Sequence, residues 1–517
     1  MSKPERGALR RLLRRTLLGI AGVIALVFLV GATGVLWPLS SPVPEAQRAP
    51  VAIVGVTVVD VRQGRLIPGQ TVVISGPRIT EVGNEQEIVV PENAERLDGR
   101  GRFLMPALWD MHAHVYAVSP MTDLPLYIAY GVTNVRDLQG CPATDDPFIA
   151  CYEDKRRWSE EAEAGRRIAP RIVEASSFMA NGPGMVARLG DVPEYFDTAT
   201  PEQARQFVKH FVGRADSIKV YDNIPRDAYF ALVDEARRHG LPVVGHKPRS
   251  ISALEAARHQ RSLEHARFLL QDAFDGADEL RAKAASSGWI EDRRAMVDRH
   301  DAAKAQQILD TMREHGVYYV PTHLTRWSDA YADQAVVRDD PALRYLHPLM
   351  QMQWEEDLDD LLQRAPTADD RQAYVDFYRK GLELTRRAQA AGVKIMVGTD
   401  YIVAGLDVHR ELEQLVLAGL TPQQALQAAT ITPADYANAA ARFGDVAPQK
   451  IADLVLLTGN PLVDIRNTQT IETVLFNGNV YGPAAIDRIK RHVRSNAASW
   501  TIGAKMVWRF IRNPANY

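Results

Sequence analysis

The length, composition and charge of the chain restrict the classes of protein to which it can belong. At 517 residues, with 46% hydrophobic and 24% charged residues, we expect two structural units or one barrel with additions. Six cationic residues and one glutamate give residues 1–40 a charge of +5. Because the net charge of the whole chain is −3, the remaining residues carry −8. A nucleic-acid partner is not expected, because the folded part has no basic excess for phosphates.

The N-terminus combines this basic cluster with a long apolar run. Residues 16–37 carry no charge, and about 20 apolar residues span a hydrocarbon core. A cleaved signal peptide has a shorter apolar region and a small-residue cleavage site, of which Ala32-Thr33-Gly34 is a poor version. We therefore predict a cytoplasmic basic stub and uncleaved transmembrane anchor at residues 1–40, followed by a tether at residues 41–50. The positive-inside rule then places the remainder outside the inner (cytoplasmic) membrane, in the periplasm of a Gram-negative source.

The chain has two cysteines, Cys141 and Cys151, in a loop-like stretch. In an exported domain such a pair is a candidate disulfide, whereas in the cytosol two free thiols are expected.

Both ends of the region after the tether are rich in β-branched residues bounded by glycine and proline, which is typical of strands. Such runs stand at residues 51–60 and 70–75 and return at residues 453–457 and 473–481. We predict a small β-sandwich domain whose parts are residues 51–102 and 445–482, with a larger domain at residues 103–444 inserted between them and a C-terminal extension at residues 483–517.

The inserted region alternates short apolar strands with helical segments, one of which is Pro225–His239. Eight strands with intervening helices predict an α/β fold, a (β/α)8 TIM barrel, whose chemistry lies at the C-terminal ends of the strands. Residues 265–318 and 323–392 exceed simple connections, so we expect helical additions there. The predicted barrel strands are Phe103–His114, Val132–Leu138, Arg171–Ser176, Ser217–Tyr221, Pro242–His246, Ser262–His265, Tyr318–Thr322 and Val393–Asp400.

The first chemical signal is Asp110-Met-His-Ala-His-Val, which follows an apolar run. Side chains at i and i+2 of a strand share a face, so His112 and His114 would both point into the barrel. Neutral imidazoles bind zinc and similar ions. A lone His-x-His pattern is a weak signal, and its position at the first βα-loop strengthens it.

Residues with metal-binding or acid–base side chains also stand in or at the ends of other predicted strands, namely Lys219, His246, His265 and Asp400. A buried lysine is costly when charged and requires a reason. Each residue alone has an ordinary explanation, such as a core salt bridge or a hydrogen-bonded histidine. The combination of six on predicted barrel strands indicates a metal site.

These residues fall within longer motifs: the His112-x-His114 opening, Gly131-Val-Thr-Asn-Val-Arg-Asp, Gly245-His-Lys-Pro with Arg261-Ser-Leu-Glu-His, Gly398-Thr-Asp400, His409-Arg-Glu-Leu-Glu and Pro448-Gln-Lys-Ile-Ala-Asp-Leu-Val-Leu-Leu. From about Val51 to Tyr481 the sequence resembles the amidohydrolase superfamily, specifically its imidazolonepropionase-like and prolidase branch. The motifs together are highly specific for the superfamily and moderately specific for the branch.

The resemblance implies two divalent metal ions, which we expect to be zinc. The His-x-His pair and Asp400 would hold one ion, His246 and His265 the other, and an N6-carboxylated Lys219 would bridge them. A hydroxide between the metals would attack the substrate carbonyl, while Asp400 takes the proton and passes it to the leaving amine. Tyr221 would hydrogen-bond the tetrahedral oxyanion or a substrate carboxylate. A packed strand-end tyrosine is the alternative explanation for that residue.

The predicted reaction is metal-dependent hydrolysis of a C–N amide or peptide bond in a small molecule, a dipeptide or an N-acyl amino acid. Alternatives on the same scaffold are a mononuclear cyclic-amide hydrolase or deaminase, and a lactone or phosphotriester hydrolase. Deaminases usually carry a glutamate three residues after the fifth-strand histidine, where this chain has Arg249, and lack the bridging lysine. A metal-free binding protein would have lost ligands, whereas all six positions are filled. Homo-oligomerisation is left open by the sequence.

Overall fold

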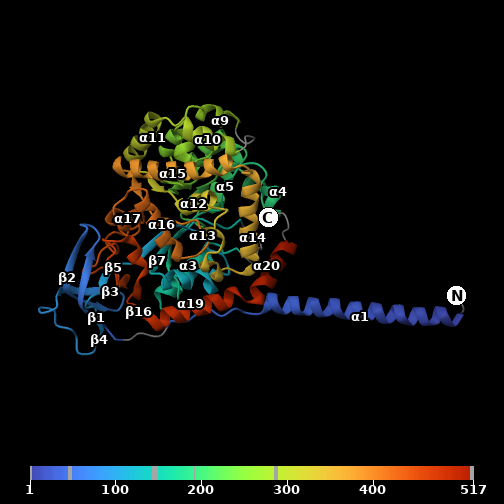
Figure 1. The fold of residues 1–517 in the computed structure, drawn as a ribbon, viewed down its shortest axis with the longest axis horizontal. Helices are drawn as coiled ribbons and strands as arrows, with labels where there is room; N and C mark the ends of the chain where they lie inside the picture. The colour runs from blue at the N-terminus through green and yellow to red at the C-terminus, as the bar shows by residue number, and fades with distance from the viewer. Residues whose placement is uncertain (1–2, 45–48, 143–148, 191, 284–288, 513–517) are drawn as a thin grey trace.

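The structure, a computed structural model, describes residues 3–44, 49–142, 149–190, 192–283 and 289–512. An N-terminal helix projects from a body in which a β-sheet lies beside an α/β barrel (Figure 1).

The sheet is built from both ends of the region after the N-terminal helix. Its strands lie in the order β16-β15-β14-β5-β1-β2-β3, with β4 beside β1. The backbone N–H of Ile79 donates to Lys450 O, so the far edge of the sheet returns to the segment before β14. Aliphatic side chains such as Ile53, Val72 and Leu456 pack on its inner face. The strands are β1 (Val51–Asp60), β2 (Arg65–Ser75), β3 (Arg78–Asn84), β4 (Glu95–Asp98), β5 (Phe103–Pro106), β14 (Leu454–Leu457), β15 (Ile471–Phe476) and β16 (Asn479–Tyr481).

The predicted barrel strand Phe103–His114 was wrong as a single element. Its first part is β5, which pairs with β14 in the sheet, and its second part is β6 (Leu108–Ala113) of the barrel. Pro106 ends β5 because proline has no N–H for a further ladder bond. The next N–H, that of Ala107, donates to Asp453 O, and the chain passes from sheet to barrel at this point.

Eight parallel strands close into the barrel. Ladders join β6-β7-β8, β9-β10 and β11-β12-β13. A bridge between Ser176 and Ser217 links β8 to β9, and Arg261 N donates to Val243 O between β10 and β11. The barrel closes where Met111 N donates to Val397 O. Its strands are β6, β7 (Val132–Asp137), β8 (Arg171–Ala175), β9 (Ile218–Val220), β10 (Val243–Gly245), β11 (Ser262–Glu264), β12 (Tyr318–Val320) and β13 (Lys394–Ile395).

Amphipathic helices separate the barrel strands. The predicted segment Pro225–His239 is α6, which begins after a proline and ends before Gly240 with its φ of 68°. The two long connections are helical as predicted, with α8–α11 in the first and α12–α15 in the second. The helices of the barrel region are α2 (Asp123–Ala129), α3 (Tyr152–Glu163), α4 (Met185–Leu189), α5 (Pro201–Phe211), α6 (Arg226–Arg238), α7 (Ala253–Ala257), α8 (Arg267–Asp272), α9 (Ala277–Lys283), α10 (Trp289–Asp298), α11 (Ala302–Glu314), α12 (His323–Ala330), α13 (Ala335–Arg338), α14 (Pro348–Arg364), α15 (Ala368–Ala390), α16 (Leu406–Leu417), α17 (Pro422–Ala428) and α18 (Ile431–Tyr436).

The N-terminal helix α1 (Lys3–Leu36) contains a 23-residue segment, Arg14–Leu36, with a mean hydropathy of 2.4. The segment is long and apolar enough to cross a membrane, and a signal sequence can have the same length and composition. The chain that follows is held on the body, because Ser40 O accepts hydrogen bonds from His492 Nε2 (2.8 Å) and Asn496 Nδ2 (3.1 Å). Both donors belong to α19 (Pro483–Ala497), which precedes the last helix, α20 (Trp500–Arg512).

Cys141 and Cys151 are joined in a disulfide, the pairing expected for an exported domain.

Candidate metal centre

The six predicted ligands come from the C-terminal parts of five barrel strands. His112 lies in β6 and Lys219 in β9, while His114, His246 and His265 directly follow the last residues of their strands. Asp400 lies in the segment after β13, which ends at Ile395. His265 (φ 69°) and Asp400 (φ 44°) adopt the left-handed region, which non-glycine residues rarely enter and which is common at functional sites.

Gly398 permits the close approach of the last strand to His112. A Cβ atom at this position would lie 2.8 Å from His112 N. A side chain here would therefore push apart two of the segments that carry the candidate ligands.

Asp400 is the centre of the first group. Its carboxylate oxygens lie 3.7 Å from His112 Nε2, 3.5 Å from His114 Nε2 and 3.7 Å from His265 Nδ1. One donor atom from each of His112, His265 and Asp400 lies within 4.8 Å of the others, close enough to share one ion. Burial alone would raise the pKa of Asp400, but His112, His114 and Lys219 lower it, so the carboxylate is ionised.

His246 and His265 form the second group. Their Nε2 atoms lie 2.9 Å apart, and burial lowers the pKa of His246 to about 4 and that of His265 well below its usual value. Burial likewise lowers the pKa of His114 to about 3, and its Nε2 is buried without a hydrogen-bond partner among the described residues. Neutral rings that direct free nitrogens at one another and at a carboxylate are a donor set that fits divalent metal ions.

Each of three histidines is held by a second residue through Nδ1. The partner of His112 is Glu264 (3.0 Å), that of His246 is Asp222 (2.7 Å) and that of His265 is Thr322 (2.8 Å). For His112 and His246, a proton on Nδ1 that is donated to the carboxylate leaves Nε2 as the nitrogen with a free lone pair.

The carboxylate of Asp222 is itself balanced by cations. Arg267 Nη2 lies 3.0 Å from its Oδ1, and Arg249 Nη2 lies 3.6 Å from its Oδ2. Although burial would raise the pKa of Asp222, Arg267 and His246 hold it well below its usual range. Asp222 therefore carries a negative charge beside His246.

Glu264 has a corresponding partner in the barrel interior. Arg136 Nη2 donates to its Oε1 at 2.7 Å, and both side chains are fully buried. Burial would raise the pKa of Glu264, but Arg136 and His112 lower it.

Asp222, Glu264 and Arg136 were missed as site residues by sequence reasoning. Glu264 and Arg136 stand inside the motifs that carried the resemblance, and Asp222 follows Tyr221 directly. Arg136 and Glu264 are charged residues on otherwise apolar strands, as Lys219 is. This pattern is the sequence signal by which they could have been found.

Lys219 and Tyr221 lie close together at the end of β9, where the Nζ of Lys219 is 5.9 Å from the centroid of the Tyr221 ring. Lys219 is buried, its Nζ donates to Leu138 O at 2.6 Å, and burial lowers its pKa. The ring of Tyr221 lies 3.9 Å, centroid to centroid, from that of His246, and burial raises the pKa of its hydroxyl. The phenol is therefore a hydrogen-bond donor near neutral pH.

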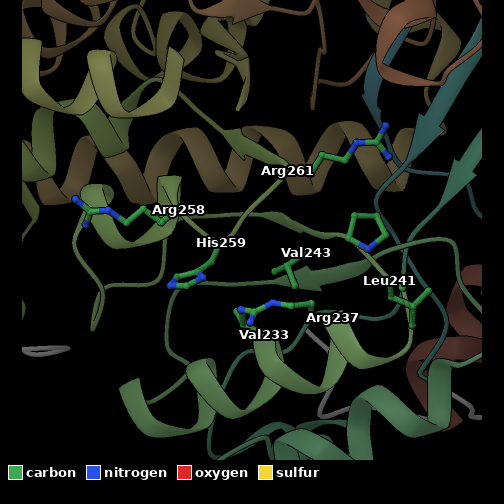
Figure 2. Close-up of a pocket in the computed structure, with 9 residues that line it drawn as sticks. Val233, Arg237, Leu241, Val243, Arg258, His259 and Arg261 are labelled. Atoms are coloured by element: carbon green, nitrogen blue, oxygen red, sulfur yellow. The ribbon is translucent and has the colours of Figure 1, made fainter. Parts of the chain in front are cut away.

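A separate pocket of about 400 Å³ lies at the other end of the barrel, where Val243 begins β10 and Arg261 precedes β11 (Figure 2). It contains none of the candidate ligands. Its lining also includes Val233, Arg237, Gly240, Leu241, Pro242, Arg258 and His259.

Residues 103–483, most of the chain, match the sequence model of the amidohydrolase family. The chain belongs to the amidohydrolase family. It is thus an enzyme, a hydrolase of the class that acts on carbon–nitrogen bonds, and the resemblance of the sequence to the amidohydrolase superfamily is confirmed. Members of the family generally bind metal ions, and the cluster of His112, His265 and Asp400 is consistent with that property.

Solved structures share the fold. A bottromycin amidohydrolase is 23% identical with a TM-score of 0.64, and the match covers 87% of this chain and 91% of that one. A putative prolidase from Bifidobacterium longum is 23% identical (TM-score 0.57, covering 87% and 100%), and a Xaa-Pro dipeptidase with bound methionine is 19% identical (TM-score 0.57, covering 84% and 100%). At these identities the likeness shows the fold alone.

Among curated proteins, an adenine deaminase from Rubrobacter xylanophilus is 32% identical over a segment that covers 16% of each chain. The chain thus matches about a sixth of the length of this relative.

The contact between Asp222 and His246 predicts the effect of one substitution. Asp222→Asn keeps the size of the side chain but removes the charge, and we expect metal affinity to fall about 10–100-fold. Competition between the purified variant and a chelator measures this affinity. The control is Asp272→Asn, whose buried carboxylate pairs with Lys247 (2.9 Å), a direct neighbour of His246 in sequence. An unchanged affinity in Asp222→Asn would show that this carboxylate does not support a ligand.

Proposed function

We propose that the chain is a two-metal hydrolase that cleaves a C–N amide or peptide bond of a small substrate, either a dipeptide or an N-acyl amino acid. The observation that carries the proposal is the arrangement of three histidines around Asp400, one of which, His265, lies 2.9 Å from His246. The Nε2 of His114 is buried there without a partner among the described residues. Such a donor set has little structural purpose without metal ions.

In this proposal His112, His114 and Asp400 hold one ion, and His246 and His265 hold the other. Zinc suits a set of imidazoles and carboxylates. When bound, the two ions lower the pKa of water and polarise the substrate carbonyl.

The proposal requires Lys219 to be N6-carboxylated, and in that form it would supply oxygen ligands to both ions. An ammonium group beside two cations is electrostatically untenable. Burial lowers the pKa of Lys219, which favours the neutral amine, the form that combines with carbon dioxide. The carbamate that results has anionic oxygen atoms in place of a cation.

Asp400 and Tyr221 carry out the proton transfer and charge stabilisation. Asp400, which is ionised, accepts a proton from the attacking water at a carboxylate oxygen and passes it to the nitrogen of the leaving amine. Tyr221 donates its phenolic hydrogen to the developing oxyanion or to a substrate carboxylate. The contact of the Tyr221 ring with that of His246 keeps the phenol beside the site.

The local match to adenine deaminase makes a deaminase the second candidate. The residue three places after His246 is Arg249, whose guanidinium lies 3.6 Å from Asp222, and an arginine there cannot replace the glutamate that deaminases usually carry. Lys219 is a further argument for the two-metal hydrolase.

We also propose that residues 1–40 anchor the enzyme in the inner membrane with the barrel outside the cytoplasm. The apolar segment Arg14–Leu36 follows a basic cluster, and the disulfide between Cys141 and Cys151 suits an oxidising compartment.

The reaction is tested with a library of dipeptides and N-acyl amino acids. We expect the purified enzyme to release a free amine from a subset of the library, and Asp400→Asn to lose nearly all turnover because the substitution removes a ligand and the proton carrier together. The matched control is Asp359→Asn, an exposed carboxylate that pairs with Arg338. Near-normal turnover by Asp400→Asn would refute the proposed site.

The bridge is tested with Lys219→Ala. This variant should lose much of its metal and its activity, and formate or acetate should restore part of the activity by supplying the oxygen atoms of the missing carbamate. Elemental analysis and the rate with each acid measure the two effects. Full metal content together with a full rate would rule out the bridge and favour a mononuclear site.

The orientation is tested by fusing a reporter that is active only in the cytosol after Tyr517. We expect little signal, and a reporter that is active only outside the cytoplasm should give a strong signal at the same position. The reverse pattern would contradict the proposed topology.

A further inference from the structure

The last helix, α20, presents an apolar stripe to solvent. Trp500, Val507, Trp508 and Ile511 are exposed, and because an α-helix has 3.6 residues per turn, these four positions fall on one side of it. The opposite side is where the helix packs on the body, since Ile502, about half a turn around the helix from Trp500 and Ile511, is buried. A surface helix of a globular protein normally has the reverse polarity, with its apolar stripe facing inward.

The exposed stripe lies beside the end of the apolar helix α1. A Cβ atom at Gly34 of α1 would lie 2.7 Å from the Cβ of Ala504, and Lys505 Nζ donates to Val35 O. Figure 1 shows α20 at the point where α1 leaves the body. If α1 spans a membrane, α20 therefore lies at the level of the membrane surface.

Helix α14 begins against α20, because a Cβ atom at Gly503 would lie 3.0 Å from the ring of His347, the residue before α14. We refer to Trp500, Val507, Trp508 and Ile511 as the α20 face.

The charge of the C-terminal segment identifies the kind of partner. From Arg488 to Tyr517 the sequence contains seven lysines and arginines and no aspartate or glutamate. Tryptophan at the polar–apolar boundary with neighbouring cations is the composition of helices that lie in a membrane interface and contact anionic headgroups.

We propose that the α20 face is a lipid-binding surface that lies in the headgroup region of the bilayer beside the anchor. The proposal rests on the proposed membrane anchor and adds a second attachment to it. A single helix would leave the body free to rotate, whereas two attachments fix its orientation.

The helices beside the proposed lipid surface also contact segments next to the candidate metal centre. The ring of Trp354 in α14 lies 5.5 Å, centroid to centroid, from that of Tyr401, the residue after Asp400. Asn496 of α19 donates to Met121 O in the connection that follows β6. The helices next to the lipid surface thus contact segments that extend from the strand ends of the metal centre.

The test uses the full chain in phosphatidylcholine vesicles, with and without phosphatidylglycerol. An environment-sensitive fluorophore is attached to single cysteines introduced as Ile511→Cys, Leu29→Cys in α1 and Val89→Cys. The native cysteines are joined in a disulfide and do not react. Leu29 (65% exposed), Ile511 (64%) and Val89 (82%) are all accessible on the protein itself. Val89 lies between β3 and β4, two strands that Figure 1 shows in the sheet, away from α1. Quenching by doxyl groups at shallow or deep positions of the lipid chains reports the depth of each label.

We expect the label at residue 511 to be quenched by the shallow doxyl group, and more strongly when the vesicles contain phosphatidylglycerol. The label at residue 29 should be quenched by the deep doxyl group. The label at residue 89 should be quenched by neither group. If residue 29 is quenched but residue 511 is quenched no more than residue 89, the lipid-binding surface is refuted and the anchor stands. A label at residue 511 that is shielded from an aqueous quencher but not quenched by lipid indicates a protein partner, including a second copy, and also refutes the proposal. Loss of quenching at residue 29 refutes the anchor itself.

A second measurement covers the case in which Ile511→Cys does not fold. In brominated lipids the intrinsic fluorescence of the wild type should be quenched more than that of Trp508→Phe. Trp158→Phe, which changes a buried tryptophan of α3, should leave the lipid-accessible quenching unchanged. Equal quenching in the wild type and Trp508→Phe would overturn the proposal.

Discussion

The candidate site depends on an ion pair inside the barrel. Glu264 accepts from Arg136 at 2.7 Å and lies 3.0 Å from His112 Nδ1, and all three side chains are buried. Arg136 Nε also donates to Met111 O next to His112, so one guanidinium fixes the backbone and, through Glu264, the ring of this histidine. Breaking a buried pair of this kind costs about 3–5 kcal/mol, because the remaining charge is uncompensated. The pair therefore fixes the geometry on which the candidate ligands of β6 depend.

Asp222 has the same relation to His246, with Arg267 as its cation. In each candidate ligand group, the Nδ1 atom of one histidine thus contacts a carboxylate, and that carboxylate pairs with an arginine. In a buried site this arrangement keeps the carboxylates ionised and orients the rings, while burial keeps the imidazoles neutral. A cationic lysine does not fit among these groups and two metal ions, and this is the physical reason to propose carboxylation of Lys219.

Much of this architecture could be predicted from the sequence. The TIM barrel followed from apolar strands that alternate with helices, and the six candidate ligands from their positions at strand ends. The boundary at Phe103 could not be predicted, because β5 and β6 form one apolar run and only the pairing of β5 with β14 separates them. The roles of Arg136 and Glu264 in the site could not be predicted for a related reason. They lie 128 residues apart, and only barrel closure brings them into contact. The exposed stripe of α20 is likewise a property of packing, since the sequence shows the stripe but not which side the body covers.

The central claim is that the histidines, Lys219 and Asp400 hold two ions in one hydrolytic site. The most direct measurement is the elemental analysis of the full-length protein, purified without chelators and at known concentration. The account predicts about two divalent ions per chain, with zinc the principal metal. A protein that is active with no bound metal, or that never binds more than one ion per chain in the presence of excess zinc, would contradict it.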